Sequence, residues 1–152
     1  MTPSLKAKTP GYVIERTAKR LKRAFQHTLV SLNADLTADQ WVLLNQVYRD
    51  PGTSQQELGA ATAKDKPTVT RILDKLESKK LVQRKAMKED RRKFGIYPTP
   101  AGEQKVETLL PDVESFRMAH FEGLNDNDVR TLLRIMDKIN SNITQTTDHA
   151  LL

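Results

Sequence analysis

The spacing of apolar residues changes at Leu81, and no other feature of this sequence constrains the fold as strongly. Before this point, apolar residues in the segment 66–78 recur at a helical spacing, one and three positions apart. After it, the pattern repeats at every second residue. Val82 and Arg84 alternate with Gln83 and Lys85, and in 94–98 Phe94, Ile96 and Pro98 alternate with Gly95 and Tyr97, which is the period of a strand. The stretch 88–93 between these runs is polar and charged. The sequence therefore predicts a helix followed by a two-stranded hairpin with a long charged loop.

The same part of the chain holds its positive charge. Residues 64–93 contain twelve Lys or Arg and five acidic residues, a net charge of +7. The whole chain carries +6, so +6 less +7 leaves −1 for the other 122 residues. A nearly neutral body with one basic segment is typical of a protein that binds a polyanion. A solvated helix face is the alternative, but it does not explain why the charge gathers at the end of the segment.

The remaining signals predict helices. Apolar spacing predicts a first helix over about 12–32, and Thr37 with Gln40 forms a capping box for the next. Thr53 or Ser54 then caps a short helix. Further helices are expected to start at Thr99-Pro100, with a kink at Pro111, and at Asn125 with Asp128.

This order defines the expected fold class. A short helix followed by a helix with a small, basic exposed face is a helix-turn-helix, and the basic hairpin after it adds a wing. The prediction is a mainly α fold with a small β-hairpin wing. The major groove of DNA admits a helix, and the tip of a hairpin can reach the narrower minor groove, which attracts arginine.

Composition argues against other classes. With no cysteine, the chain has no disulfide, no thiolate metal site and no thiol sensor. The three histidines, His27, His120 and His149, lack the spacing of helical metal ligands, so we expect no metal and no cofactor. No nucleophile is paired with a base and no glycine-rich phosphate loop occurs, so we expect no enzyme. Without a signal peptide or membrane span, a cytoplasmic protein is expected.

Four segments carry a resemblance to a known family. They read LTADQWVLL (36–44), SQQELGAAT (54–62), DKPTVTRILDKLESKKLV (65–82) and EDRRKFGIYPTPAG (89–102). In this order they resemble the MarR (multiple antibiotic resistance) family of bacterial and archaeal regulators, over about residues 12–145. The wing of that family carries an Asp-x-Arg motif ahead of a Leu-Thr-x-x-Gly ending. Here Pro98 replaces the leucine, which puts the hydrogen bonds at the end of that strand in doubt. Lys80 stands where a glycine is common, so the turn before the wing must form without the φ freedom of glycine.

The resemblance implies a set of DNA contacts. Contacts to phosphate from the start of the short helix would come from Ser54, Gln55 and Gln56. The recognition helix would face the major groove with Lys66, Pro67, Thr68, Thr70 and Arg71, and Lys75 is included in the interface. In the wing, Arg92 would enter the minor groove, oriented by Asp90, with Lys88, Arg91 and Lys93 on the flanking backbone.

Several of these positions have a structural alternative. Thr68 and Thr70 could be ordinary helix-surface residues, and Asp90 a loop-turn residue. Arg71 could pair with Asp74, or Lys75 with Glu77, in a structural network.

The resemblance also implies a homodimer on a palindromic operator. The predicted organisation is a flexible arm (1–11), a dimerisation region (12–35 and 101–145), a winged helix-turn-helix lobe (36–100) and a frayed tail (146–152). Alternatively, the same apolar stripes could cover the core of a monomer. The expected interface residues are Ile14, Leu21, Phe25, Val113, Phe116, Leu132, Leu133, Met136, Ile139 and Ile143.

Many members of the family respond to small aromatic or phenolic ligands. The matching positions are Arg16, Arg20, His27, Trp41, Tyr48 and Met118. Trp41 lies on an apolar stripe and has a core position as its alternative, while His27 could be a surface or interface residue. The expected function is a ligand-responsive, sequence-specific repressor that binds double-stranded DNA. The alternatives are a non-specific architectural DNA-binding protein and a protein-interaction module with an acidic partner.

Overall fold

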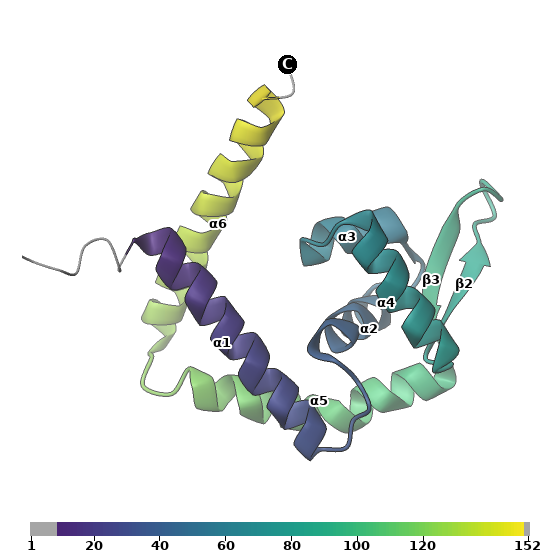
Figure 1. Ribbon diagram of the computed structural model, residues 1–152, viewed down its shortest axis with the longest axis horizontal. Coiled ribbons are helices and arrows are strands. Elements are labelled where there is room, and N and C mark those ends of the chain that lie inside the picture. Colours follow the sequence, from purple (N-terminus) through teal and green to yellow (C-terminus); the bar gives the residue numbers. More distant parts are fainter. Residues whose placement is uncertain (1–8, 151–152) are drawn as a thin grey trace, which may run out of the picture. The chain divides into compact units, whose positions relative to one another are not determined.

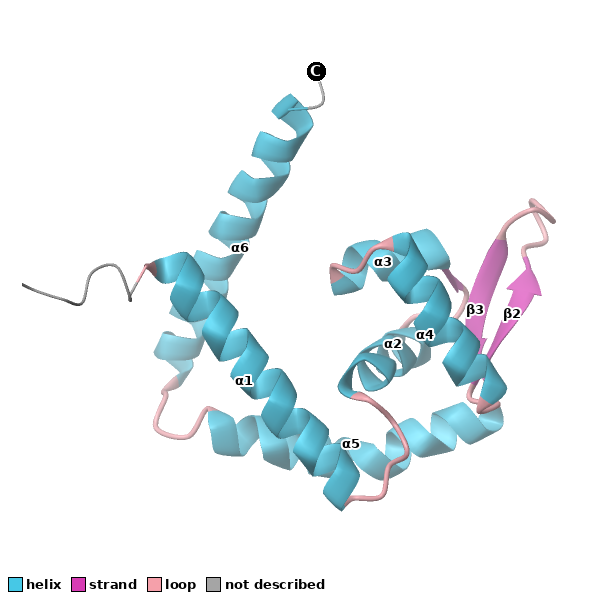
Figure 2. Cartoon of the chain, viewed as in Figure 1, coloured by secondary structure: helices cyan, strands magenta, loops and turns pink. Residues whose placement is uncertain are grey.

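The computed structural model describes residues 9–150 and, of their side chains, those of residues 9–146. Six helices and three strands follow one another along these residues (Figures 1 and 2). The helices are α1 (Pro10–Ser31), α2 (Ala38–Arg49), α3 (Gln55–Thr62), α4 (Lys66–Ser78), α5 (Pro100–His120) and α6 (Asp126–Ala150). The strands are β1 (Thr53–Ser54), β2 (Val82–Ala86) and β3 (Phe94–Pro98). The predicted winged helix-turn-helix is confirmed.

The chain divides into two compact units, one up to Phe116 and one from Arg117. In this division α1 and most of α5 group with the winged helix-turn-helix lobe. The second unit consists of the end of α5, a turn and α6.

Local capping starts the helices where the sequence predicts. The Thr37 hydroxyl accepts the Gln40 N–H at 3.1 Å, and the Gln40 side chain accepts the Thr37 N–H at 3.2 Å. Ser54 and Glu57 form the same reciprocal box at α3. Asp65 caps α4, with Pro67 inside the first turn. Each box satisfies backbone N–H groups that a helix start leaves unpaired.

The hairpin belongs to a three-stranded antiparallel sheet in the order β1-β3-β2. β2 and β3 pair from Val82 opposite Pro98 to Ala86 opposite Phe94, which confirms the predicted hairpin. The third strand was not predicted: Thr53 and Ser54 pair with Ile96 and Gly95. Two residues are too few to show an alternating pattern, so the sequence carries no strand signal there.

The end of β3 is held without the usual leucine. Pro98 is the last residue of its strand, and β1 does not extend to it. The next residue, Thr99, donates its N–H to the Leu81 carbonyl at 3.0 Å, and its hydroxyl donates to the Lys80 carbonyl at 2.6 Å. The Thr99 hydroxyl also accepts the Gly102 N–H at 3.0 Å. Thr99 therefore links the strand end to the start of α5.

Lys80 makes the turn before the wing in a left-handed conformation, with φ of 59°. Its N–H donates to the Glu77 carbonyl at 2.8 Å, and the Leu81 N–H donates to the Leu76 carbonyl at 3.0 Å. This pair of bonds is the Schellman ending of a helix, a position usually filled by glycine.

Lys80→Gly is expected to stabilise the protein by about 0.5–1 kcal/mol, because glycine adopts this φ without the strain that a Cβ causes. Chemical denaturation would measure the change. Ser78→Gly, two positions earlier in helical backbone, is the matched control and should lose about as much. A Lys80→Gly protein that unfolds at lower denaturant than the wild type would contradict the expectation.

The core of the first unit lies between α2, α4, the hairpin and the inner faces of α1, α3 and α5. Its largest buried side chains include Trp41, Leu43, Leu44, Leu58, Leu73 and Leu76. Val113 is 1% exposed and belongs to this core, which corrects its placement in a dimer interface. The core position of Trp41, the alternative to a ligand-binding role, is confirmed.

The predicted chain ends differ from the observed helices. α1 begins at Pro10, inside the predicted arm 1–11, because proline suits a first helical position. Residues 1–8 lie outside the described residues. α6 continues to Ala150, where a frayed tail was expected from 146, and the hydroxyls of Thr144 and Thr146 bond to carbonyls one turn earlier. Residues 151–152 lie outside the described residues. α5 continues through Pro111.

Among the described helices, none combines the length and apolar character needed to cross a bilayer.

Candidate nucleic-acid interface

One face of α4 gathers most of the residues assigned to the major groove. Together they line a single shallow hollow of the surface, whose members are Lys66, Pro67, Thr70, Arg71, Asp74 and Lys75. Pro67, Arg71 and Lys75 are exposed. The spacing of three and four along the helix brings these side chains to one side, as expected. Asp74 was not among the predicted contact residues. It is an acidic residue in a hollow whose other charged residues are basic.

The two threonines of α4 have partners within the protein. The Thr68 N–H donates to the Asp65 carboxylate at 2.8 Å, and hydrogen bonds from the Thr68 side chain and backbone lower the pKa of Asp65. The Thr70 hydroxyl donates to the Lys66 carbonyl at 2.9 Å and accepts a hydrogen bond from the Gln55 side-chain amide. Gln55 and Thr70 thereby connect α3 to α4.

The start of α3 faces the base of the wing. Ser54 caps α3, so its hydroxyl already accepts the Glu57 N–H at 3.1 Å. A second hollow of the surface is lined by Ser54, Gln55, Gln56, Arg84, Lys93, Phe94 and Ile96. Neither Arg84 nor Phe94 is among the site residues predicted from the sequence. Phe94 is exposed although it begins a strand, and it pairs with Ala86 next to the loop of the hairpin.

Asp90 shapes the tip of the wing through the backbone. Its carboxylate accepts the Arg92 N–H at 3.0 Å, and its carbonyl accepts the Lys93 N–H at 2.9 Å. Lys93 in turn accepts the Met87 N–H at 2.8 Å and closes the loop. The hydrogen bond of the Asp90 carboxylate is therefore that of a loop-turn residue, and it fixes the backbone of Arg92. The side chains of Lys88, Arg91, Arg92 and Lys93 are exposed.

The alternative network of Arg71 with Asp74 and Lys75 with Glu77 does not form. Within residues 9–146, neither Arg71 nor Lys75 makes an ion pair. Arg84 of β2 takes both acids instead: its guanidinium lies 2.8 Å from the Asp74 carboxylate and also pairs with Glu77. Arg71 and Lys75 therefore have no ion-pair partner among the side chains that the structure describes.

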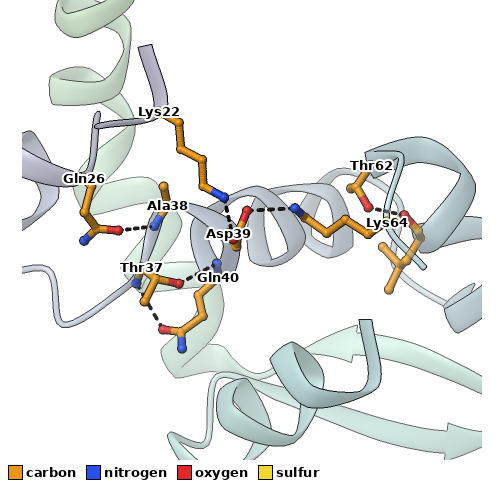
Figure 3. A network of polar contacts seen from close by, with 9 residues as sticks. Lys22, Gln26, Thr37, Ala38, Asp39, Gln40, Thr62 and Lys64 are labelled. Atoms are coloured by element: carbon orange, nitrogen blue, oxygen red, sulfur yellow. Dashed lines mark hydrogen bonds and ion pairs between the residues drawn. The ribbon is translucent and has the colours of Figure 1, made fainter. Parts of the chain in front are cut away.

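Lys64 belongs to the basic segment but points into the body of the protein. Its side chain is 17% exposed, and its ammonium lies 2.7 Å from the Asp39 carboxylate at the start of α2 (Figure 3). The other Asp39 oxygen is 2.8 Å from Lys22 of α1. Burial alone would raise the pKa of Asp39, but the hydrogen bonds and charges of Lys22 and Lys64 outweigh it and lower this pKa. The stabilisation is present at neutral pH and is lost as the pH falls through the lowered pKa.

The residues implied for an effector site belong to three helices and to both units. Arg16 and His27 are exposed on α1, and the Arg16 guanidinium lies 5.7 Å from the centre of the Tyr12 ring. Arg20 is exposed as well. The Tyr48 hydroxyl donates to the Glu107 carboxylate at 3.2 Å, which is the first cause of its raised pKa. Met118 is exposed and belongs to the second unit.

The apolar residues expected at a dimer interface fall into two groups. In the first unit, Phe25 packs against Trp41 and Phe116, with ring centres 6.3 and 5.1 Å apart, and is half-buried. Ile14, Leu21 and Phe116 are half-buried too. In the second unit, Leu132, Leu133 and Ile143 are exposed, while Met136 and Ile139 are half-buried. An apolar stripe that is exposed on α6 in one chain is typical of a surface that a partner covers.

Comparison with known proteins agrees with this geometry. Residues 36–94 match the model of the MarR family. BpsR of Bordetella bronchiseptica, whose DNA binding is regulated by 6-hydroxynicotinic acid, is 29% identical, with 86% of this chain and 97% of that chain covered and a TM-score of 0.75.

Two further structures share the fold at lower identity. A MarR family transcriptional regulator of Listeria monocytogenes, solved with a 26mer DNA, is 22% identical, with 91% of both chains covered and a TM-score of 0.82. MepR of S. aureus, solved with DNA, is 23% identical, with 89% of this chain and 98% of that chain covered and a TM-score of 0.78.

Proposed function

We propose, from the premise that residues 36–94 form a MarR-family domain, that this chain is a sequence-specific DNA-binding regulator of transcription that acts as a repressor. The observation that carries the proposal is the face of α4. Lys66, Arg71 and Lys75 share one surface there, and no carboxylate within the described residues forms an ion pair with Arg71 or Lys75. Side-chain cations without a carboxylate partner, such as Arg71 and Lys75, are available to bind phosphates and base edges of DNA.

The roles of the individual residues follow from their positions. α4 enters the major groove with Lys66, Pro67 and Arg71 towards the DNA, and Lys75 contacts phosphate. Thr68 donates its N–H to the capping residue Asp65, and Thr70 accepts a hydrogen bond from Gln55. We therefore assign both threonines to holding the motif together and leave the reading of bases to Arg71. Gln56 at the start of α3 and the exposed cations of the wing contact the backbone on either side.

Specific recognition is separated from general DNA binding by competition. The protein is expected to select a site from random duplexes and to bind it roughly 10³-fold or more tightly than bulk DNA at the same salt concentration. Affinity should fall steeply with salt, because bound phosphates release counterions. Equal affinity for the selected site and bulk DNA would point to an architectural protein instead. If the protein binds no DNA at moderate salt, a protein-interaction module is the only one of the three functions that remains.

The regulator is proposed to act as a homodimer. The exposed apolar residues of α6, including Leu132 and Leu133, support this, because monomers rarely expose such stripes to solvent. A two-fold dimer would read two half-sites about 34–36 Å apart, one turn of DNA. Light scattering should give twice the mass of the chain, and a monomer at micromolar concentration would refute the assembly.

A small aromatic acid is proposed to release the protein from DNA. The support is the ligand of BpsR, 6-hydroxynicotinic acid, together with exposed Arg16, Arg20 and His27 on one helix. A bound ligand would raise the melting temperature and weaken the operator complex. A panel of phenolic and nicotinic acids that changes neither quantity would count against this part of the proposal.

A further inference from the structure

The proposed DNA-facing surface of α4 contains a carboxylate. Asp74 lines the same hollow as Lys66, Arg71 and Lys75, and its side chain is 62% exposed. A carboxylate on this surface repels phosphate. It also lies three residues after Arg71, a spacing at which opposite charges on a helix pair readily. Asp74 would therefore oppose DNA binding in two ways if it had no other partner.

Arg84 supplies that partner from the adjacent strand. Its guanidinium lies 2.8 Å from the Asp74 carboxylate, and a second nitrogen pairs with Glu77 one turn further along α4. The Arg84 side chain is 22% exposed, the least exposed member of this cluster. Its strand position fixes it, because Arg84 pairs with buried Ile96 in the middle of the hairpin.

The geometry requires arginine. One planar guanidinium presents several N–H groups in a fixed fork, so it can serve two carboxylates at once from a position beside the helix. A lysine ammonium is a single point of charge on a flexible stem. Arg84 itself does not line the hollow on α4; it lines the separate hollow at the base of the wing.

We propose that Arg84 is a positioning residue for DNA binding, which holds Asp74 away from Arg71 so that Arg71 is free to meet the DNA. The inference rests on the proposed function of α4 as the recognition helix. Arg84 acts through Asp74 and Arg71. It contributes to DNA affinity because Asp74 then pairs with Arg84 and leaves Arg71 without a carboxylate partner. Glu77 gives the guanidinium a second anchor and keeps it on the side of α4 that faces the wing.

The test compares variants of the full-length protein on its selected operator at about 0.15 M salt, where distant charges are screened beyond about 8 Å. Arg84→Ala is expected to weaken binding about tenfold, because Asp74 turns to Arg71 and adds a negative charge near phosphate. Arg84→Ala combined with Asp74→Asn has the same net charge as the wild type and lacks the acid. Its affinity should return to within about twofold of the wild type.

A control with equal net charge separates this local effect from the overall charge. Arg84→Ala combined with Glu15→Gln removes an exposed acid of α1, whose ion pair is with Lys19 on the same helix. It should bind as weakly as Arg84→Ala alone. Melting curves establish that each variant is folded, and Arg84→Gln replaces Arg84→Ala if the alanine variant is not.

The possible outcomes decide between the two proposals. A wild-type protein that binds no DNA overturns both the proposed function and this inference. If the wild type binds and Arg84→Ala binds equally well, only the role of Arg84 fails. If Arg84→Ala is weak and Asp74→Asn does not restore it, the loss comes from a distorted hairpin, and the inference is again wrong.

Discussion

Replacing Gly102 with alanine is expected to lower the free energy of unfolding by about 3 kcal/mol, at the upper end of what overpacking a core costs. Gly102 is buried in the first turn of α5. A Cβ at this position would lie 2.0 Å from the Leu81 carbonyl oxygen and 3.0 Å from its carbonyl carbon. Both atoms are backbone, so no flexible side chain can move aside.

The expected damage extends to the wing, because Leu81 immediately precedes β2. The Leu81 carbonyl accepts the Thr99 N–H at 3.0 Å, and this bond ties the end of β3 to the turn after α4. Moving α5 away from Leu81 would break it. Gly102→Ala should therefore also weaken DNA binding, although Gly102 is remote from the proposed contacts.

Urea denaturation followed by circular dichroism measures the effect. Gly11→Ala is the matched control, because a Cβ at Gly11 in the first turn of α1 would meet nothing within 4 Å. It should leave stability unchanged or raise it by up to about 1 kcal/mol, since alanine favours helix. Equal midpoints for Gly102→Ala and Gly11→Ala would show that α5 and Leu81 are farther apart than the structure places them.

Arg92→Ala is expected to weaken operator binding by about 1–3 kcal/mol, roughly ten- to a hundredfold. Arg92 is exposed at the tip of the wing, and its backbone is fixed by the Asp90 carboxylate. An arginine presented in this way suits the minor groove, where the potential is most negative over A·T-rich sequence. Fluorescence anisotropy at fixed salt gives the affinity, and an unchanged value would remove Arg92 from the interface.

Two neighbours serve as controls for Arg92. Arg91→Ala removes the same charge from a flanking position, so it should cost less on the operator and act equally on all sequences. Asp90→Asn keeps an oxygen that can accept the Arg92 N–H, whereas Asp90→Ala removes it. If Asp90 acts as a loop-turn residue, the asparagine variant should bind like the wild type and the alanine variant should not.

The parts of the fold that the sequence predicts are local. Thr37 with Gln40 lies within one helical turn, and the residues of each cap sit within a few positions of one another. The hairpin is similarly contained in residues 82–98. Interactions at this range depend on backbone geometry that every helix or hairpin shares, so the order of residues is sufficient.

The parts that were missed depend on which distant segments meet. Strand β1 has two residues and exists because β3 offers it a partner. Arg84 and Asp74 are ten positions apart, across a turn whose direction the left-handed Lys80 sets. The alternative weighed for Arg71, a pair with Asp74, used helix spacing alone and could not include a competing cation from another element.

Val113 shows the same limit for the core. Its position on an apolar stripe is equally compatible with a core and with a partner chain, because periodicity identifies an apolar face without naming what covers it. The structure buries Val113 within one chain and leaves Leu133 of α6 exposed.

The sequence by itself determined that this chain carries a helix-turn-helix with a basic wing, and that its positive charge lies in residues 64–93. Only the tertiary structure decided which of those charges are available. It directs Lys64 to Asp39 and Arg84 to Asp74 and Glu77, while Arg71, Arg92 and Lys75 remain exposed. The physical reason is that a charge is neutralised by whichever opposite charge lies within about 4 Å, and that distance is fixed by packing between elements rather than by order along the chain.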